Sequence, residues 1–368
     1  MKVLFTGGGT GGHVSPAIAI AEILRKNGEL DDCLFVGRLG GDENNAIINK
    51  GYRISYIDVS PIPRNISLKA LKAVSKVFEA KSDARLFIKE FKPDVVIATG
   101  GYVSYPVLKA SRKEGIPTVI HESNGYPGLV TRRLAKKCTF VLIGMESAKK
   151  YLKHSDNVIL SGNPVKEDFL KYGYTSARKI LGVRPEEKLI ISFGGSGGAD
   201  RINDTVIDLM REYSRNNKNV RHIHAVGRKK YDKVKAKYPE LTKRERHSKC
   251  RIVPYIDNMP LLLNAADLAI TRSGAMTLAE LKSTGTPAIL IPSPNVASNH
   301  QYYNAIDAMD KQGASVITEN DLSLDNLIKK TNEILLRKRD GSRDDLALKL
   351  KNEAICEQII LNTVKRCK

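Results

Sequence analysis

The chain is poor in the residues that mark several large protein classes. It has no tryptophan, aromatic residues make up 6% of its 368 residues, and its five cysteines lie far apart with no CxxC pair. Scattered cysteines are typical of reduced thiols in a cytoplasm and argue against a disulfide-stapled or zinc-stabilised domain. The longest apolar runs, such as residues 95–98 and 288–291, are far shorter than the roughly 20 residues of a membrane-spanning helix. We expect no signal peptide, because the first predicted strand begins at residue 2.

Acidic residues are fewer than basic residues. The chain has 40 Asp and Glu against 60 Lys and Arg, which gives a formal net charge of +20. An excess of this size fits an anionic partner, such as nucleic acid, anionic lipid or a phosphorylated substrate, although a lysine-rich solubilising surface fits as well. No RNA-binding aromatic motif, zinc finger or basic zipper is present, which disfavours nucleic acid.

Short segments rich in valine and isoleucine alternate with helix-length segments along the whole chain. Because parallel strands covered by helices on both faces give this rhythm, the sequence predicts an α/β fold with doubly wound parallel sheets. The chain is long enough for two domains, and a second series of strands begins at Lys188. We therefore expect two domains facing across a cleft, with the linker near Asn163 and Pro164. The predicted strands are KVLFT, CLFVG, YRISYIDV, DVVIATGG, PTVIHES, TFVLIG and VILSGNPV, then KLIISFGG, VRHIHAVG, RIVPYID, DLAITRSG, PAILIP and ASVITE.

The segment KVLFTGGGTGGH, residues 2–13, joins the first predicted strand to a loop with five glycines. Glycines let the backbone approach an anion, and a helix that we expect to open at Ser15 and Pro16 adds unpaired N–H groups. The loop therefore predicts nucleotide or phosphate binding. It fits GxGxxG, but the next strand ends in Arg38 and not in the acidic residue that dinucleotide-binding sites use for the ribose. No GxxxxGK[ST] motif is present, which disfavours a P-loop ATPase or kinase.

Two further glycine loops follow predicted strands in the second half. Residues 194–198 lead into a helix near Asp200, and residues 273–275 lead into the helix MTLAELKSTG. Because ligands bind at the carboxyl ends of strands in open α/β sheets, loops in both halves predict a ligand between the two domains. A single loop of this kind is equally compatible with a simple tight turn.

Seven motifs follow one another along the chain: GGGTGGH (7–13), GGYVSYP (100–106), HESNGYPG (121–128), GNPV (162–165), FGGSGGA (193–199), TRSGAMTLAE (271–280) and NHQYYNA (299–305). In this set the chain resembles the MurG family of bacterial N-acetylglucosaminyltransferases. The resemblance implies a GT-B fold of two Rossmann-like parallel-sheet domains, with inverting transfer of GlcNAc from UDP-GlcNAc to the C4 hydroxyl of the MurNAc of lipid I. It divides the chain into residues 1–163, 164–340 and 341–368, the last a helix that packs back on the first domain.

Other functions stay open from the residues alone. Another GT-B enzyme, such as a glycolipid glucosyltransferase or a UDP-GlcNAc 2-epimerase, is the nearest alternative. A nucleotide-sugar-binding or nucleic-acid-binding protein without turnover is a more distant one. The chain departs from the family at Gly197, Lys166 and His300, where members often carry glutamine, arginine and glutamine.

The resemblance implies that UDP-GlcNAc binds mainly to the C-terminal domain. In such a site Glu280 holds the ribose, the backbone of Ile256 reads the uracil, and loop amides hold the diphosphate, where charge grows as the sugar leaves. The implied donor-binding residues are Thr10, Gly11, Gly12, Asn124, Lys166, Ser196, Ile256, Ala275, Met276, Thr277, Glu280, Gln301 and Asn304.

The resemblance also implies that the acceptor hydroxyl lies near His13, with Glu122, Asn124 and Tyr102 close by. Inverting transfer requires this hydroxyl to lose a proton as it attacks, and a neutral imidazole accepts a proton near physiological pH. His13, Glu122 and Asn124 are thus the predicted catalytic residues, with His13 the expected base. A histidine beside a glycine loop equally fits a phosphate contact. No cofactor and no protein-bound metal are expected.

The segment LKALKAVSKVF, residues 68–78, predicts an amphipathic helix with apolar residues on one half and lysines on the other. Residues 64–92 hold eight basic and three acidic residues. The alternative is a helix that buries its apolar side on the sheet. We expect this helix to bind the anionic cytoplasmic face of the membrane, where the resemblance implies lipid I and other cell-wall synthesis proteins as partners. The predicted membrane residues are Leu68, Lys69, Leu71, Lys72, Lys76 and Phe78.

Overall fold

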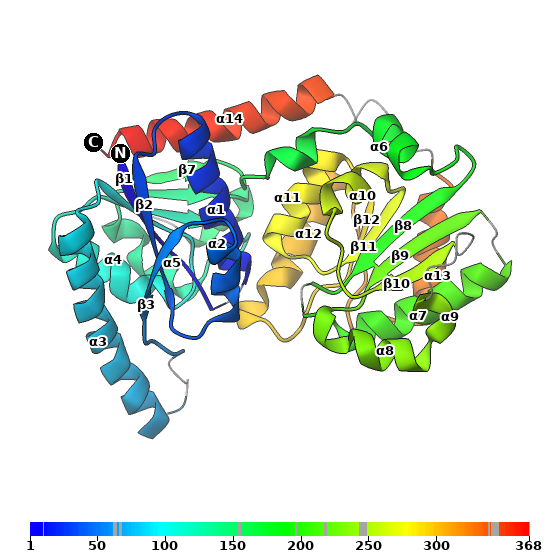
Figure 1. Ribbon diagram of the computed structural model, residues 1–368, viewed down its shortest axis with the longest axis horizontal. Helices are drawn as coiled ribbons and strands as arrows, with labels where there is room; N and C mark the ends of the chain where they lie inside the picture. Colours follow the sequence, from blue (N-terminus) through cyan, green and yellow to red (C-terminus); the bar gives the residue numbers. More distant parts are fainter. Residues whose placement is uncertain are drawn as a thin grey trace. The chain divides into compact units, whose positions relative to one another are not determined.

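Two compact units make up the chain. The computed structural model describes residues 1–9, 11–61, 65, 68–152, 156–195, 197–216, 219–242, 249–337, 339 and 346–367, apart from the side chains of residues 68–71, 311–312, 346–350 and 352. Unit 1 contains Met1–Val165 and Glu353–Lys368, and unit 2 contains Lys166–Asn352 (Figure 1). The chain therefore enters unit 2 directly after Val165 and returns to unit 1 at Glu353.

Unit 1 is built on a seven-stranded sheet in the order β3-β2-β1-β4-β5-β6-β7. All neighbouring strands are parallel. The strands are β1 (Lys2–Thr6), β2 (Asp32–Arg38), β3 (Arg53–Ile57), β4 (Val95–Ala98), β5 (Thr118–Glu122), β6 (Phe140–Ile143) and β7 (Val158–Leu160). The helices are α1 (Gly11–Lys26), α2 (Asn45–Ile48), α3 (Leu68–Phe91), α4 (Ser104–Lys113), α5 (Leu129–Leu134) and α14 (Leu346–Lys365).

Helices cover both faces of this sheet, as the alternation of strand side chains requires. Val3 and Phe5 of β1 point to the face covered by α1, α2 and α14. Leu4 points to the opposite face, which α3 and α4 cover, and α5 continues that layer over β6. Each strand is therefore buried on both sides, which explains its nearly continuous apolar sequence.

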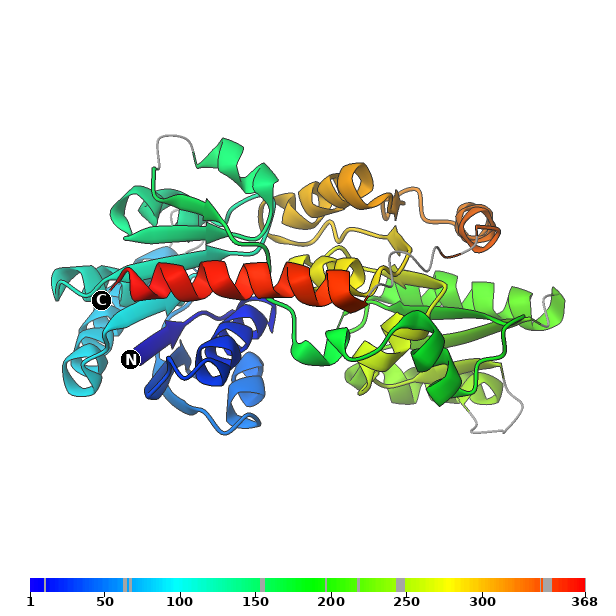
Figure 2. The ribbon, with the colours of Figure 1, turned by 90° about the horizontal axis from the view of Figure 1, so that it is seen from above.

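The last helix returns to the first unit. Ile360 of α14 is fully buried in the core beside α1, and Lys365 forms an ion pair with Glu29 at 2.7 Å. Figure 2 shows this half of α14 lying alongside α1. The carboxylate of Glu353 accepts a hydrogen bond from the Val165 amide at 3.2 Å. This bond joins the two points at which the chain leaves and re-enters unit 1.

Unit 2 repeats the plan with a six-stranded parallel sheet in the order β10-β9-β8-β11-β12-β13. Helices α7, α9 and α13 cover one face of this sheet (Figure 1). Helix α10 packs on β8, and α6 and α11 pack against α10. The strands are β8 (Lys188–Phe193), β9 (Val220–Ala225), β10 (Cys250–Val253), β11 (Leu268–Thr271), β12 (Ala288–Leu290) and β13 (Ser315–Val316). The helices are α6 (Tyr174–Leu181), α7 (Asp200–Asn216), α8 (Tyr231–Lys237), α9 (Pro239–Thr242), α10 (Met259–Ala265), α11 (Ala275–Thr284), α12 (His300–Gln312) and α13 (Leu324–Leu335).

The prediction of two doubly wound parallel sheets is confirmed, and each strand falls on a predicted segment. In both sheets the strand order reverses beside the first strand of the unit, between β1 and β4 and between β8 and β11. Loops at such a reversal diverge and leave room for a ligand at the carboxyl ends of the strands. All three predicted glycine loops follow one of these four strands.

Helix α1 begins at Gly11, a full turn before the predicted opening at Ser15, and Pro16 lies inside it. The early start is held by tertiary contacts that the local sequence does not reveal. Thr99, directly after β4, donates its hydroxyl to the carbonyl oxygen of His13 at 2.6 Å. The N-cap prediction for Ser15 was therefore wrong, because contacts from a neighbouring strand override the local capping preference.

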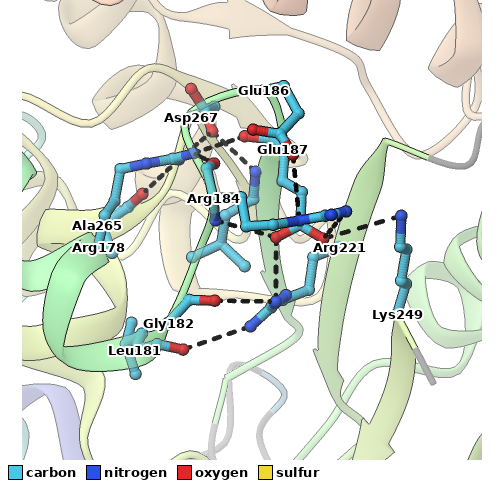
Figure 3. Close-up of polar contacts among 11 residues, drawn as sticks. Arg178, Leu181, Gly182, Arg184, Glu186, Glu187, Arg221, Lys249, Ala265 and Asp267 are labelled. Carbon is cyan, nitrogen blue, oxygen red and sulfur yellow. Dashed lines mark hydrogen bonds and ion pairs between the residues drawn. The ribbon is translucent and has the colours of Figure 1, made fainter. Parts of the chain in front are cut away.

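Buried charged side chains join the starts of strands β8 and β11 in unit 2 (Figure 3). Arg178 of α6 donates to Asp267 Oδ2 at 2.8 Å and to the carbonyl oxygens of Arg184 and Glu187 at 2.7 and 2.6 Å. The side chains of Arg178 and Asp267 are only 8% and 5% exposed. Arg221 pairs with the buried carboxylate of Glu187 at 3.0 Å. These contacts tie α6 to the central strands at the sheet edge opposite the glycine loops.

Two buried histidines of β9 lie in the core of unit 2. His222 Nε2 and His224 Nδ1 of β9 lie 2.7 and 2.9 Å from the hydroxyl of Ser192 on β8. Burial lowers the pKa of His222 well below its ordinary value and that of His224 to about 4. Both rings are therefore neutral at physiological pH, and they link β8 to β9 just before the loop at residues 194–198.

Candidate functional site

The first glycine loop and His13 meet the loop after β4 in unit 1. His13 lies in the first turn of α1, with Nδ1 3.2 Å from the carbonyl oxygen of Thr99. Its ring packs over Gly100, where an added Cβ would lie 2.8 Å from Nδ1 and where φ is +107°. If Nδ1 carries the proton and donates to Thr99, Nε2 is the basic nitrogen of the ring. Gly11 and Gly12 begin the same helix, while Thr10 lies outside the described residues.

Glu122 ends β5 and organises the loop that follows it. Its carboxylate accepts hydrogen bonds from the backbone and side-chain amides of Asn124 at 3.1 and 3.0 Å, from the Gly128 amide at 2.8 Å and from the Thr131 hydroxyl at 2.8 Å. Glu122 is only 4% exposed. The loop itself therefore supplies four hydrogen-bond donors to this buried carboxylate. In this arrangement Glu122 orients Asn124.

Two glycine loops in unit 2 connect a strand to a helix. After β8, Gly198 adopts φ +71°, and an added Cβ there would lie 1.9 Å from the carbonyl oxygen of Val226. After β11, Gly274 caps α11 without a side-chain hydrogen bond, so the amides of Ala275, Met276 and Thr277 open the helix. Such helix starts attract anions. Ser196 lies outside the described residues.

Helix α12 supports the loop after β11. Ser273 donates its hydroxyl to the carbonyl oxygen of Gln301 at 2.7 Å, and the side-chain oxygen of Gln301 accepts from the Ser293 amide at 2.9 Å. Asn304 is fully buried and donates to the carbonyl oxygen of Ser273 at 3.1 Å. Asn304 therefore helps to hold the loop, and its contact to the donor sugar stays a prediction.

A cavity of about 470 Å³ opens beside these loops within unit 2. Its lining includes basic residues that were not among the predicted site residues. Arg272 forms an ion pair with Glu319 at 2.5 Å and donates to the carbonyl oxygen of Ile291 at 3.1 Å, and Lys230 pairs with Asp200 at 2.5 Å. The lining residues are Gly194, Gly198, Ala199, Asp200, Arg201, Lys230, Arg272, Ser293, Asn295, Gln301 and Glu319.

The predicted ribose and base contacts lie near the same strand ends. Burial raises the pKa of Glu280 on α11 to about 7, and the nearby charge of Lys166 opposes part of that rise. Ile256 follows β10 and is 5% exposed, and the contact of its backbone to the uracil stays a prediction. Asn258, two residues later, caps α10 by accepting from the Leu261 amide at 3.4 Å.

The comparisons with known proteins identify the family. Residues 3–143 match the glycosyltransferase family 28 N-terminal domain, and residues 189–358 match the glycosyltransferase family 28 C-terminal domain. The chain belongs to glycosyltransferase family 28. Within this family it is 42% identical over 336 residues, 91% of each chain, to a protein of Thermoanaerobacter sp. (strain X514) named UDP-N-acetylglucosamine--N-acetylmuramyl-(pentapeptide) pyrophosphoryl-undecaprenol N-acetylglucosamine transferase. A protein of the same name from Caldanaerobacter subterraneus subsp. tengcongensis is 39% identical over 95% of this chain and 98% of its own.

Solved structures agree on the fold of this family 28 glycosyltransferase. MurG of Acinetobacter baumannii superposes with a TM-score of 0.73 at 23% identity, over 99% of both chains. The UDP-GlcNAc 2-epimerase of Neisseria meningitidis gives a TM-score of 0.62 at 14% identity over 100% of both chains. Likeness at such identities shows the GT-B fold alone. The choice between transferase and epimerase therefore depends on the close relatives, which favour the transferase.

Sequence reasoning missed the charged lining of the unit 2 cavity in this glycosyltransferase. Arg272 lies inside the quoted motif TRSGAMTLAE, but its side chain was given no role. Lys230 ends a basic run after β9, Arg228-Lys229-Lys230, which could have drawn attention as a loop at a carboxyl strand end. Among the described residues, no group of three His, Cys, Asp or Glu side chains could hold a metal ion.

Helix α3 exposes part of its apolar surface. Phe78 is 68% exposed and Val74 is 38% exposed, whereas Ala80 and Ala84 are buried in the core between α3 and the sheet. Lys72 is exposed, and Lys76 pairs with Asp58 at 2.6 Å. The side chains of Leu68, Lys69 and Leu71 lie outside the described part of the chain. In the described helices we find none with both the length and the apolar character of a bilayer span.

Proposed function

We propose that this glycosyltransferase transfers GlcNAc from UDP-GlcNAc to the C4 hydroxyl of the MurNAc of lipid I and so forms lipid II for peptidoglycan synthesis. The 42% identity over 91% of both chains to a transferase with that name carries the proposal. The relatives' name supplies the substrates, and the residues at the carboxyl strand ends of the two sheets supply a chemistry that suits them.

Unit 2 provides groups suited to the donor. The amides that open α11 would bind the diphosphate, and Arg272 and Lys230 of the neighbouring cavity, which pair with Glu319 and Asp200, would add basic groups. Glu280 would accept hydrogen bonds from the ribose hydroxyls, the backbone of Ile256 would read the uracil, and Gln301 would contact the sugar. Negative charge grows on the departing UDP, so fixed donors of this kind lower the barrier most when aimed at that charge.

Unit 1 provides groups suited to the acceptor. His13 would accept the proton of the attacking hydroxyl at Nε2, because the contact between Nδ1 and Thr99 favours the tautomer that is basic at Nε2. Asn124 would hold the acceptor, and Glu122 fixes its amide. In one displacement the hydroxyl oxygen bonds to the anomeric carbon, the bond from that carbon to UDP breaks, and the configuration inverts.

The test is a turnover assay with purified protein. We expect UDP release from UDP-GlcNAc only when a lipid I analogue is added, together with a product that carries one additional GlcNAc by mass. Formation of UDP-ManNAc without acceptor would instead indicate an epimerase. Binding of UDP-GlcNAc without release of UDP in the presence of acceptor would contradict catalysis.

The reaction should proceed without a protein-bound metal. Helix amides and the basic side chains that line the cavity would meet the charge of the diphosphate in place of a divalent cation. We expect kcat with excess EDTA to stay within about threefold of kcat with Mg²⁺. A loss of activity in EDTA that Mg²⁺ or Mn²⁺ restores would contradict this expectation.

Removal of the Glu280 charge should weaken nucleotide binding. Because the pKa of Glu280 is raised to about 7, its carboxylate ionises above that pH and protonates below it. Ribose hydroxyls donate more strongly to the ionised form, so UDP affinity should fall as the pH drops from 8 to 6. Glu280→Gln should weaken UDP binding about 10- to 100-fold at pH 8 and remove this pH dependence, as measured by calorimetry.

The matched control for that variant is Glu186→Gln, which removes one exposed charge from the same unit. It should bind UDP like the wild type at both pH values. An undiminished affinity of Glu280→Gln, or the same pH dependence in that variant, would end the assignment of Glu280 to the ribose.

We further propose that α3 binds the anionic cytoplasmic leaflet, on which the lipid acceptor resides. The exposure of Phe78 and Val74 beside lysines supports this, because an apolar side chain flanked by cations suits a lipid headgroup layer. Other cell-wall synthesis proteins remain expected partners on the same membrane, and no nucleic acid is expected.

Charge reversal on α3 should release the protein from vesicles. Each well-placed cation contributes about 1 kcal/mol to binding of anionic lipid, so changing Lys69, Lys72 and Lys76 to glutamate should weaken binding about 100-fold or more. Co-sedimentation with phosphatidylglycerol vesicles measures this. The matched control reverses three exposed lysines of α8, Lys233, Lys235 and Lys237, and should bind normally. Equal losses in both triple variants would show that net charge, and not α3, determines binding.

A further inference from the structure

Glu43 places a carboxylate on the first glycine loop. It lies in the short turn after β2, Asp42–Asn44, and its Oε1 accepts the Gly9 amide at 2.7 Å. The side chain is 7% exposed, and Arg38 Nε lies 3.8 Å from the same oxygen. A short charge-assisted bond from an enclosed carboxylate is a strong restraint on a loop.

The carboxylate fits a space shaped for it. A Cβ added at Gly41 would lie 2.8 Å from the carboxylate, and one added at Gly8 would lie 3.4 Å from Oε1. On another side of the loop, an added Cβ at Gly9 would lie 2.7 Å from the ring of Tyr102. Burial raises the pKa of Tyr102, and the Glu43 charge adds to that rise while Arg38 opposes it. Gly9 therefore lies between Glu43 and Tyr102, where only glycine fits.

The hydrogen bond between Glu43 and the Gly9 amide limits which part of the glycine loop can bind a ligand. The Gly9 amide, which a phosphate would otherwise engage, is already bound to an internal anion. At Gly11, which opens α1, an added Cβ would meet no described atom within 4 Å. The accessible part of the loop is therefore the start of α1, which carries His13 in its first turn.

We propose that Glu43 is a positioning residue of the acceptor site. By holding the Gly9 amide it fixes the loop between β1 and α1, and it thereby sets the direction in which the start of α1 and His13 meet the acceptor. The inference deepens the proposed function and rests on it. The proposal also gives a reason for an acidic residue beside a glycine-rich loop of the kind that binds phosphate. That residue, Glu43, comes from a turn more than thirty residues beyond Gly9 in the sequence.

Hydrogen exchange tests the contact without reference to activity. In Glu43→Ala the Gly9 amide should exchange at least roughly tenfold faster than in the wild type, while the amides of β1 keep their protection. Glu43→Gln retains an acceptor oxygen and should stay close to the wild type. Unchanged exchange at Gly9 in the alanine variant would overturn the inference, and so would a loss of protection that extends through β1.

Kinetics test the positioning role. Glu43→Ala should lower kcat/KM for the lipid I analogue roughly 10- to 100-fold with the KM for UDP-GlcNAc within about twofold, and Glu43→Gln should restore most of the loss. Asp42→Ala, at the exposed neighbouring residue, is the control and should behave like the wild type. Wild-type kinetics for Glu43→Ala, or an equal loss for both substrates, would overturn the inference. An inactive wild type would refute the proposed function instead and would leave the exchange result standing.

Discussion

Replacement of His13 by glutamine is expected to reduce kcat by about 10²- to 10⁴-fold, the usual loss when a general base is removed. Glutamine can retain a contact with the Thr99 carbonyl oxygen, so the first turn of α1 should keep its place. The side-chain amide cannot take a proton from the attacking hydroxyl. The acidic limb of the wild-type pH profile of kcat should therefore disappear in the variant, while the KM for UDP-GlcNAc stays within about threefold.

His300→Gln is the matched control for that experiment. His300 is partly exposed at the start of α12, with Nδ1 2.9 Å from the carbonyl oxygen of Ala297. This variant should keep its activity within a few-fold of the wild type. Near-wild-type turnover in His13→Gln would exclude His13 as the base, and phosphate contact beside the glycine loop would then be its role.

Replacement of Arg178 by methionine is expected to lower the free energy of unfolding by about 3–5 kcal/mol, because the buried Asp267 carboxylate loses its closer cation and keeps only Lys188, at 3.7 Å. The guanidinium also serves the carbonyl oxygens of Arg184 and Glu187, which would lose their donors. Urea denaturation followed by circular dichroism measures the loss. The folded variant should retain its affinity for UDP, because the charged cluster lies at the amino ends of β8 and β11, away from the glycine loops (Figure 3).

Arg184→Met is the matched control in the same cluster. The Arg184 side chain is 58% exposed and pairs with Glu186 at 3.2 Å and, more loosely, with the buried Glu187 at 3.5 Å. Glu187 keeps its pair with Arg221 in this variant. An exposed pair such as that of Arg184 with Glu186 contributes about 1 kcal/mol or less. A similar loss for both variants would mean that burial does not determine the effect. A stable Arg178→Met would mean that Asp267 is satisfied by Tyr174, the Leu189 amide and Lys188, which also contact it.

The strands were predictable because burial on both faces leaves a local signature. Segments such as DVVIATGG and KLIISFGG are apolar at nearly every position, and each became a central strand, β4 and β8. The glycine loops were predictable for the same local reason, since residues 7–9 and 194–198 lie where a strand must turn sharply into a helix. Helix α7 begins at Asp200, as predicted.

Contacts between distant segments were not predictable in this way. Nothing near Gly9 in the sequence indicates that Glu43 binds its amide, and nothing near Asn304 indicates that it is buried behind Ser273. The early start of α1 depends on Thr99, which lies 86 residues beyond His13. Such pairs arise because parallel strands bring loops from different parts of the chain to one edge.

The sequence by itself determined two parallel-sheet units, the loops at their strand ends and, through its motifs, the glycosyltransferase family. Only the tertiary structure decided which groups those loops present: a histidine held over Gly100, a glutamate used to orient Asn124, and a cavity lined by Arg272 and Lys230. The physical reason is that apolar patterns and glycines determine the backbone conformation of only a few neighbouring residues. The burial, charge and direction of a side chain depend instead on elements that only the sheet order brings together.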